Sequence, residues 1–255
     1  MKFSLYRRII QLITWLFVFI LSFALFRLPT AVCWLCPFWY LQYLSATGNA
    51  DLRLFLGVGW SPPQFTFLVI IGGFLLVTLI FGRVFCSWIC PLGSLLEQVE
   101  KNSPFKIRKL PFNFLPFLKY LSLILFLALA FIYRNAIFCM FCPAGFIFRG
   151  FTGLFLTSSV IVFFLVIIFS LIYGWKAWCK VICPLGGFLG LLSKAQVYGI
   201  RVSGKKCKKC LDCEAVCPTE VKITEYTDKK ELKNTECLMC LKCIEACKEH
   251  MLKFP

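Results

Sequence analysis

The C-terminal part of the chain contains CKKCLDCEAVCP at 207–218 and CLMCLKCIEACK at 237–248, two runs with the same cysteine spacing. Each run reads Cys-x-x-Cys-x-x-Cys-x-x-x-Cys, in which three close cysteines bind one iron–sulfur cluster and the fourth binds the other. The pattern predicts two [4Fe–4S] clusters. Their predicted ligands are Cys207, Cys210, Cys213 and Cys247 for the first, and Cys237, Cys240, Cys243 and Cys217 for the second.

This spacing is typical of bacterial two-cluster ferredoxins. Residues 200–255 are therefore predicted to form a small α+β ferredoxin domain. A domain of this length buries little apolar surface, and bound clusters supply stability that burial does not. Structural zinc is the alternative for spaced cysteines, but two copies of the same four-cysteine run argue against it.

The rest of the chain is apolar and basic. Hydrophobic residues make up 60% of the 255 residues and charged residues 16%, against about 25% charged in an average soluble domain. The formal charge is +16, which the positive flanks of membrane spans explain better than binding to nucleic acid. A single histidine and the lack of haem-attachment and dinucleotide-binding motifs exclude haem and leave no support for a flavin or NAD site.

Long apolar runs at 9–26, 65–82, 114–133 and 151–175 predict four transmembrane helices, because about 20 apolar residues cross a ~30 Å hydrocarbon core. Basic residues gather at the N-terminus and between the second and third runs, so the positive-inside rule places both termini in the cytoplasm. The predicted fold class is an all-α four-helix transmembrane bundle of two pseudo-symmetric two-helix repeats, followed by the α+β ferredoxin domain. The predicted location is multi-pass in the cytoplasmic (inner) membrane of a bacterium or archaeon.

The body before residue 200 repeats its cysteine motifs. Each half carries Cys-x-x-Cys-Pro and then Cys-x-x-x-Cys-Pro-Leu-Gly, which predicts one repeat at 1–110 and another at 111–199. A basic residue, Arg83 or Lys176, stands three positions before the first cysteine of the second motif. Cysteines three or four residues apart share a helix face, and the following Pro suits the start of a new helix, whose N-terminus stabilises a thiolate.

The two motifs of one half are separated by a whole span of about 27 Å, so one half does not close a four-cysteine site unless its ends re-enter the membrane. Like motifs are therefore predicted to meet across the pseudo-twofold axis. Cys86, Cys90, Cys179 and Cys183 are predicted to hold an inner-face iron–sulfur centre, and Cys33, Cys36, Cys139 and Cys142 an outer-face one. A re-entrant site within one half and disulfides between the outer cysteines are the alternatives.

With these cysteines placed, the chain resembles the NapH/MauN family of ferredoxin-type membrane proteins. The resemblance covers nearly the whole length and includes an Arg-Arg-x-x-Gln motif (Arg7, Arg8, Gln11), two Cys-x-x-x-Cys-Pro motifs and a C-terminal ferredoxin. It implies a quinol dehydrogenase component that passes electrons to a periplasmic reductase, or an electron donor for cofactor maturation. The additional Cys-x-x-Cys-Pro motifs depart from the simplest family pattern and suggest a redox centre on the outer side as well.

We therefore predict a membrane iron–sulfur electron-transfer protein that connects the ferredoxin domain, one or two clusters in the body, and a quinone or a redox partner such as a reductase or ferredoxin. It is predicted to be a redox subunit of an oxidoreductase, surrounded by lipid and without a catalytic residue of its own. The alternative is a thiol–disulfide relay or maturation factor that uses the outer cysteine pairs as dithiols. Polar candidates for a quinone site, each more readily interpreted as an interface anchor, are Gln11, Lys119, Tyr120 and Ser122.

Overall fold

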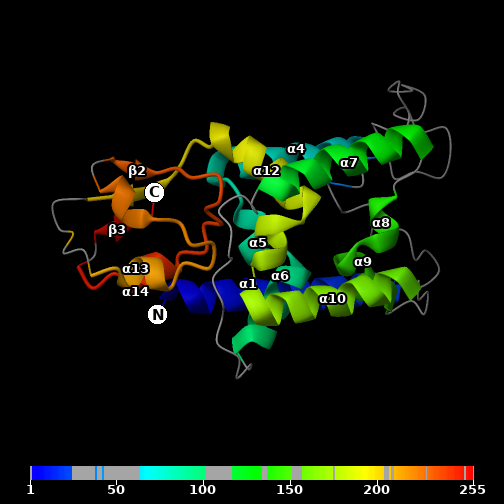
Figure 1. Cartoon of the computed structure of the whole chain (residues 1–255), viewed down its shortest axis with the longest axis horizontal. Helices are drawn as coiled ribbons and strands as arrows, with labels where there is room; N and C mark the ends of the chain where they lie inside the picture. The colour runs from blue at the N-terminus through cyan, green and yellow to red at the C-terminus, as the bar shows by residue number, and fades with distance from the viewer. Residues whose placement is uncertain are drawn as a thin grey trace.

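The computed structural model describes residues 2–24, 38, 42, 64–101, 117–133, 137–150, 157–174, 176–203, 207, 210–227, 229–249 and 251–254. Helices form the described part of the chain up to residue 195, and a small antiparallel sheet with short helices forms the part after it (Figure 1). These two parts are called the body and the tail below. The tail lies at one end of the body, and both ends of the chain lie there too.

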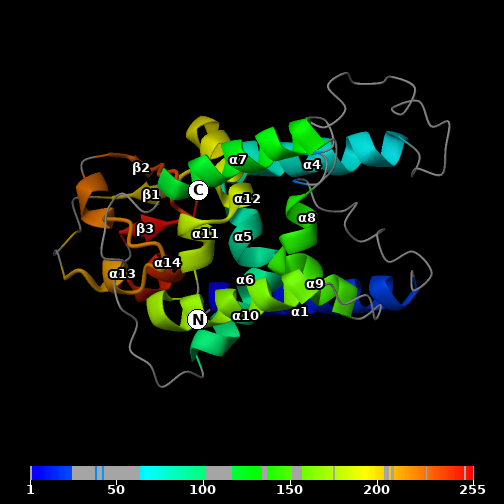
Figure 2. The ribbon, with the colours of Figure 1, turned by 45° about the vertical axis from the view of Figure 1, so that its right-hand side comes forward.

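Four helices of the body run along its length: α1 (Lys2–Ala24), α4 (Gln64–Phe81), α7 (Leu118–Tyr133) and α10 (Thr157–Tyr173). In both views α4 and α7 lie along one edge of the body, and α1 and α10 lie along the opposite edge (Figures 1 and 2). The body also has the shorter helices α5 (Val84–Trp88), α6 (Pro91–Lys101), α8 (Phe138–Phe141), α9 (Pro143–Gly150), α11 (Ala177–Val181) and α12 (Pro184–Leu192). Helices α5, α8 and α11 lie between the two edges, whereas α6 contacts α1 and α10, and α12 contacts α7 and α4 (Figure 2).

Helices α4 and α10 end in the same way. Each is followed by a glycine in the left-handed region, Gly82 with φ of 69° and Gly174 with φ of 96°. Their N–H groups donate to the carbonyls of Thr78 at 2.7 Å and Ser170 at 2.9 Å. Glycine adopts this conformation without the penalty of a side chain, so both helices stop just before a cysteine motif and the chain turns into α5 or α11.

No helix among the described residues is both long and apolar enough to cross a membrane. With 16 residues in α7 and 17 in α10, these helices are ~24–26 Å long against a hydrocarbon core of about 30 Å. The longer α1, with 23 residues, includes Lys2, Arg7 and Arg8. The predictions of a four-helix transmembrane bundle and of an inner-membrane location are therefore wrong.

The tail sheet has three short strands: β1 (Ile200–Val202), β2 (Glu231–Leu232) and β3 (Leu252–Lys253). Their order is β2-β1-β3, with Ile200 opposite Leu232 and Val202 opposite Leu252. These four side chains are buried in one apolar core. The tail also contains α13 (Asp212–Ala215), α14 (Lys242–Ala246) and a 3₁₀ turn, η5 (Ile223–Tyr226), and another such turn, η3 (Ser193–Ala195), ends the body.

Candidate iron–sulfur sites

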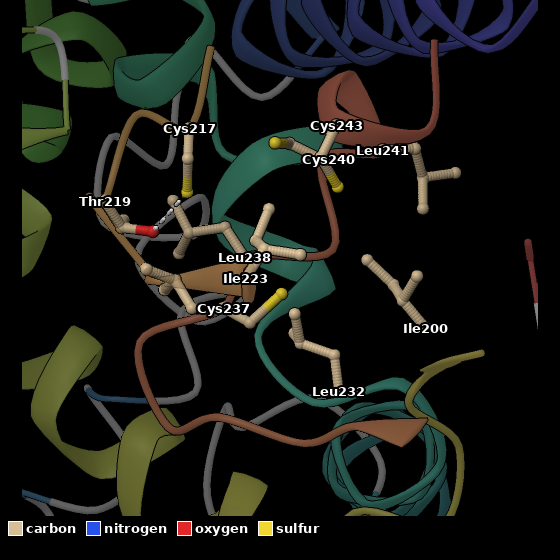
Figure 3. Close-up of a pocket in the computed structure, with 11 residues that line it drawn as sticks. Ile200, Cys217, Thr219, Ile223, Leu232, Cys237, Leu238, Cys240, Leu241 and Cys243 are labelled. Atoms are coloured by element: carbon tan, nitrogen blue, oxygen red, sulfur yellow. Dashed lines mark hydrogen bonds between the residues drawn. The ribbon is translucent and has the colours of Figure 1, made fainter. Parts of the chain in front are cut away.

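One cavity of the tail, called cavity A, is lined by Cys217, Cys237, Cys240 and Cys243. Figure 3 shows these four thiols around a shared space. The other lining side chains are apolar apart from Thr219, and they are Ile200, Val221, Ile223, Leu232, Leu238 and Leu241. Cavity A therefore collects three cysteines of the second run and the last cysteine of the first run inside an apolar wall.

A second cavity, called cavity B, has the complementary set. It is lined by Cys207, Cys210, Cys213 and Cys247, together with Leu211, Thr224, Glu249 and Met251. The fourth cysteine of each run thus lies with the first three of the other run. The structure brings together the same two sets of four cysteines that the spacing assigns, and cluster ligation by them stays a prediction.

Two strained residues turn the cysteine runs around their cavities. Leu211 and Leu241 stand between the second and third cysteine of each run and have φ of 62° and 61°. A residue with a side chain in this conformation costs of order 1–3 kcal/mol and persists where surrounding structure requires it. The Leu211 carbonyl accepts the N–H of Glu214 at 3.0 Å, and the Leu241 carbonyl accepts the N–H of Ile244 at 3.1 Å, so each leucine begins a short helix, α13 or α14.

Three of the tail thiols, Cys213, Cys237 and Cys243, have raised pKa values and so resist ionisation. Burial raises the pKa of Cys237 to about 12, and burial together with the charge of Cys247 raises the pKa of Cys213 to about 11. Burial also raises the pKa of Cys243, and the charges of Cys240, Cys237, Cys217 and Cys213 raise it further. Four clustered thiols become thiolates together only when a positively charged group compensates them, and an iron–sulfur cluster fits such a donor set.

The described residues contain no group of three His, Cys, Asp or Glu side chains arranged around a single metal ion. The thiols of each tail cavity instead surround a shared space. Thiolate sulfur is the soft donor that iron–sulfur clusters use.

The body brings together the four cysteines of its two Cys-x-x-x-Cys-Pro motifs. Cys86 in α5 and Cys179 in α11 are buried, and Cys90 and Cys183, which precede α6 and α12, are half-buried. Burial and the charges of Cys179 and Cys86 raise the pKa of Cys90 to about 12. The same causes raise the pKa of Cys183. Both repeats therefore contribute two thiols to one region, called the body site below.

The predicted outer-face set is described only in part. Cys33, Cys36 and the side chain of Cys139 lie outside the described residues. Cys142 is half-buried before α9, and its charge contributes to the raised pKa of Cys183. The predicted placement of the two sets on opposite faces of a membrane is wrong, because no helix among the described residues is long and apolar enough to cross one. The assignment of the four outer cysteines to one centre stays a prediction.

The basic residues of the two repeats make reciprocal contacts. Lys176 Nζ donates to the Cys86 carbonyl at 2.7 Å, and Arg83 Nη2 donates to the Cys179 carbonyl at 3.1 Å. Both side chains are fully buried. Each cation therefore contacts the backbone of the first cysteine in the Cys-x-x-x-Cys-Pro motif of the other repeat. The repeat in the sequence did not predict this reciprocal contact.

The second cysteine run of the tail docks on α5. The Ser87 hydroxyl donates to the Leu238 carbonyl at 2.8 Å, and Trp88 Nε1 donates to the Met239 carbonyl at 3.0 Å. Nearby, Glu236 forms ion pairs with Arg83 at 3.1 Å and with Lys119. Cavity A and the body site thus share a boundary formed by residues next to Cys237 and Cys86. Sequence reasoning missed this junction, because its acceptors are mostly backbone carbonyls.

Three of the polar candidates for a quinone site form hydrogen bonds or an ion pair within the protein. Gln11 Nε2 donates to the Ser87 carbonyl at 3.0 Å, and the Ser122 hydroxyl donates to the Ile182 carbonyl at 2.6 Å. Lys119 is fully buried against Glu236. These side chains hold body elements and tail together.

Comparison with known proteins also indicates iron–sulfur binding. A model of a 4Fe-4S binding domain matches residues 63–110, 115–157 and 155–209, and a model of a 4Fe-4S dicluster domain matches residues 199–248. The methylamine utilization ferredoxin-type protein MauN of Paracoccus denitrificans is 30% identical over 69% of this chain and 64% of its own length. The ferredoxin-type protein NapH of Escherichia coli is 24% identical over 71% of this chain and 66% of its own length.

The chain belongs to the NapH/MauN family of ferredoxin-type proteins. This confirms the resemblance stated from its motifs. An uncharacterized protein of Methanocaldococcus jannaschii is also similar, at 34% identity over 92% of this chain and 91% of the relative. No solved structure matches the chain significantly. As a NapH/MauN-type protein with 4Fe-4S domains, it is an iron–sulfur electron-transfer protein.

Proposed function

We propose that the chain carries electrons between a redox partner and a series of three iron–sulfur centres, two in the tail and one in the body. Cavity A and cavity B would each hold a [4Fe–4S] cluster, and the body site would hold a third centre on Cys86, Cys90, Cys179 and Cys183. The observation that carries the proposal is that each tail cavity is lined by four cysteines drawn from both runs. A bound cluster supplies one-electron transfer at a potential set by its surroundings.

Contacts between the three sites support an order for them along the electron-transfer path. Cys213 of cavity B and Cys243 of cavity A lie in one apolar core, and α13 contacts α14, so the two tail sites are neighbours. Cavity A adjoins the body site through the contact between Ser87 and Leu238. Cys210 of cavity B is exposed, which leaves that end of the series accessible to a partner. The order is therefore cavity B, cavity A and the body site, with a redox protein or a quinone as the external partner.

Iron content and spectroscopy test the tail sites. Protein purified without oxygen should contain about four irons for each centre and show iron–sulfur signals by electron paramagnetic resonance (EPR) after reduction. Cys247→Ser should remove the same centre as Cys210→Ser, and Cys217→Ser should remove the same centre as Cys240→Ser. If Cys247→Ser and Cys240→Ser instead remove one centre together, each run closes its own site and the interleaved assignment is wrong.

The body site has a parallel test. Cys86→Ser and Cys179→Ser should remove one centre and leave both tail signals in place, because each repeat supplies half of the ligands. Loss of different centres in the two variants would contradict the shared site. An iron-free protein whose cysteines cycle between dithiol and disulfide would support the thiol–disulfide relay instead.

A further inference from the structure

Arg83 lies between cavity A and the body site and contacts residues of both. Its Nη2 donates to the carbonyl of the body cysteine Cys179, and its Nη1 donates to the carbonyl of Thr235 at 3.1 Å. The same Nη1 pairs with Glu236, the residue before Cys237 of cavity A. A guanidinium is always charged and presents five N–H donors in a fixed plane, so this one buried cation contacts residues beside both sites.

Glu236 does not cancel this charge. It is shared between two fully buried cations, Arg83 and Lys119, so the three groups carry a net positive charge. Burial alone lowers the pKa of Arg83, but the charges of Cys86, Glu236, Cys179 and Cys183 outweigh burial and raise it. The charge of Arg83 also opposes the rise in the pKa of Cys237. Its field therefore acts on cysteines of both sites.

Lys176 is the counterpart of Arg83 in the second repeat and provides a matched comparison. It is equally buried and donates to the Cys86 carbonyl at 2.7 Å. Burial lowers its pKa, and the charges that oppose this belong to Cys179, Cys86, Cys90 and Glu97. These four residues all belong to the body, so the strongest electrostatic neighbours of Lys176 are on one side of the junction only.

We propose that Arg83 is a positioning residue that raises the reduction potential of two centres at once, the body centre and the cavity A centre, whereas Lys176 acts on the body centre alone. The proposal rests on the proposed function, because it needs a centre at each site. Reduction adds one electron, taken from the redox partner, to a centre held by four thiolates, and no bond to the protein forms or breaks. A nearby buried cation stabilises the added negative charge, and the low dielectric of the interior strengthens the effect.

The test is a redox titration of the full-length protein, followed by EPR with dithionite as reductant. Cys90→Ser and Cys240→Ser first assign the signals of the body centre and the cavity A centre. Arg83→Gln should then shift both centres to more negative potential, each by at least tenfold in the one-electron equilibrium, which is ~59 mV. Lys176→Gln should shift only the body centre. Arg83→Lys keeps the charge and should bring both potentials back toward the wild-type values.

An unchanged cavity A potential in Arg83→Gln, or an equal shift of that potential in Lys176→Gln, would overturn the proposal. If Arg83→Gln does not retain iron, Arg83→Lys decides the matter. Retained iron with both potentials near wild type supports the electrostatic role, and an equal loss of iron shows that Arg83 is only structural. A wild-type protein without a body centre would refute the proposed function as well, whereas bound centres with unmoved potentials refute this inference alone.

Discussion

Truncating Leu238 should detach the second cysteine run from the body. Leu238 is 2% exposed and, among the described residues, is the one tail residue in an apolar cluster with Cys86 and Leu189 of the body. Replacing a buried leucine with alanine costs about 2–5 kcal/mol, because methyl groups lose their contacts and a cavity remains. Since each 1.4 kcal/mol is about tenfold in an equilibrium constant, a loss of about 3 kcal/mol makes the undocked state roughly a hundredfold more populated.

Hydrogen exchange measures this opening. In Leu238→Ala the amides of α5 and of residues 237–241 should exchange faster by a similar factor, because they lose protection when the contact opens. Leu252→Ala is the matched control, since Leu252 is also 2% exposed but lies in the tail core opposite Val202. It should speed exchange in the tail sheet more than in α5. Unchanged exchange in α5 of Leu238→Ala would refute the reasoning that this side chain docks the tail.

Two further predictions concern the cysteine motifs. Gly186→Ala should lower the iron content of the body site, because its Cβ would lie 2.6 Å from the Cys179 carbonyl oxygen. Gly73→Ala in α4 has nothing within 4 Å and should leave iron content unchanged while stabilising the helix by about 0.5–1 kcal/mol, as thermal melting would show. Because the pKa of Cys237 is raised to about 12 and that of Cys213 to about 11, cluster assembly must release protons, and anaerobic reconstitution of the apo protein with iron and sulfide should load more iron at about pH 8.5 than at about pH 6.5. Equal iron loading at the two pH values would mean that the thiols are already ionised.

The first three cysteines of each tail run could be grouped from sequence because their grouping depends on local geometry, whereas the exchange of the fourth cysteine came from the spacing that is typical of two-cluster ferredoxins. Three cysteines within seven residues face one cavity once Leu211 or Leu241 turns the chain, and the spacing encodes that turn. The junction could not be derived in the same way. Ser87 and Leu238 are joined through a backbone carbonyl, which every residue possesses, so no motif marks the contact.

The prediction of four transmembrane helices from the apolar runs was wrong because composition does not determine where a helix begins and ends. Within the run at 151–175 the structure describes residues 157–174, where α10 extends from Thr157 to Tyr173 and Gly174 follows with φ of 96°. The glycines that follow α4 and α10 precede the cysteine motifs closely enough to belong to them. Helix length in this chain is therefore set by the requirements of the cysteine motifs as well as by hydrophobicity.

The sequence difference between the two cysteine runs explains which of them faces the body. The second run begins Glu236-Cys237-Leu238-Met239, whereas the first begins Lys206-Cys207-Lys208-Lys209. Arg83 and Lys119 are buried cations at the junction, so they attract a glutamate at the first of these positions and would repel a lysine. At the two positions after the cysteine, Leu238 and Met239 are each 2% exposed. Lysine ammonium groups at these positions would lose their hydration without gaining a partner of opposite charge. Charge and hydrophobicity therefore place cavity A against the body site, whereas Cys210 of cavity B is exposed, as the proposed transfer to an external partner requires.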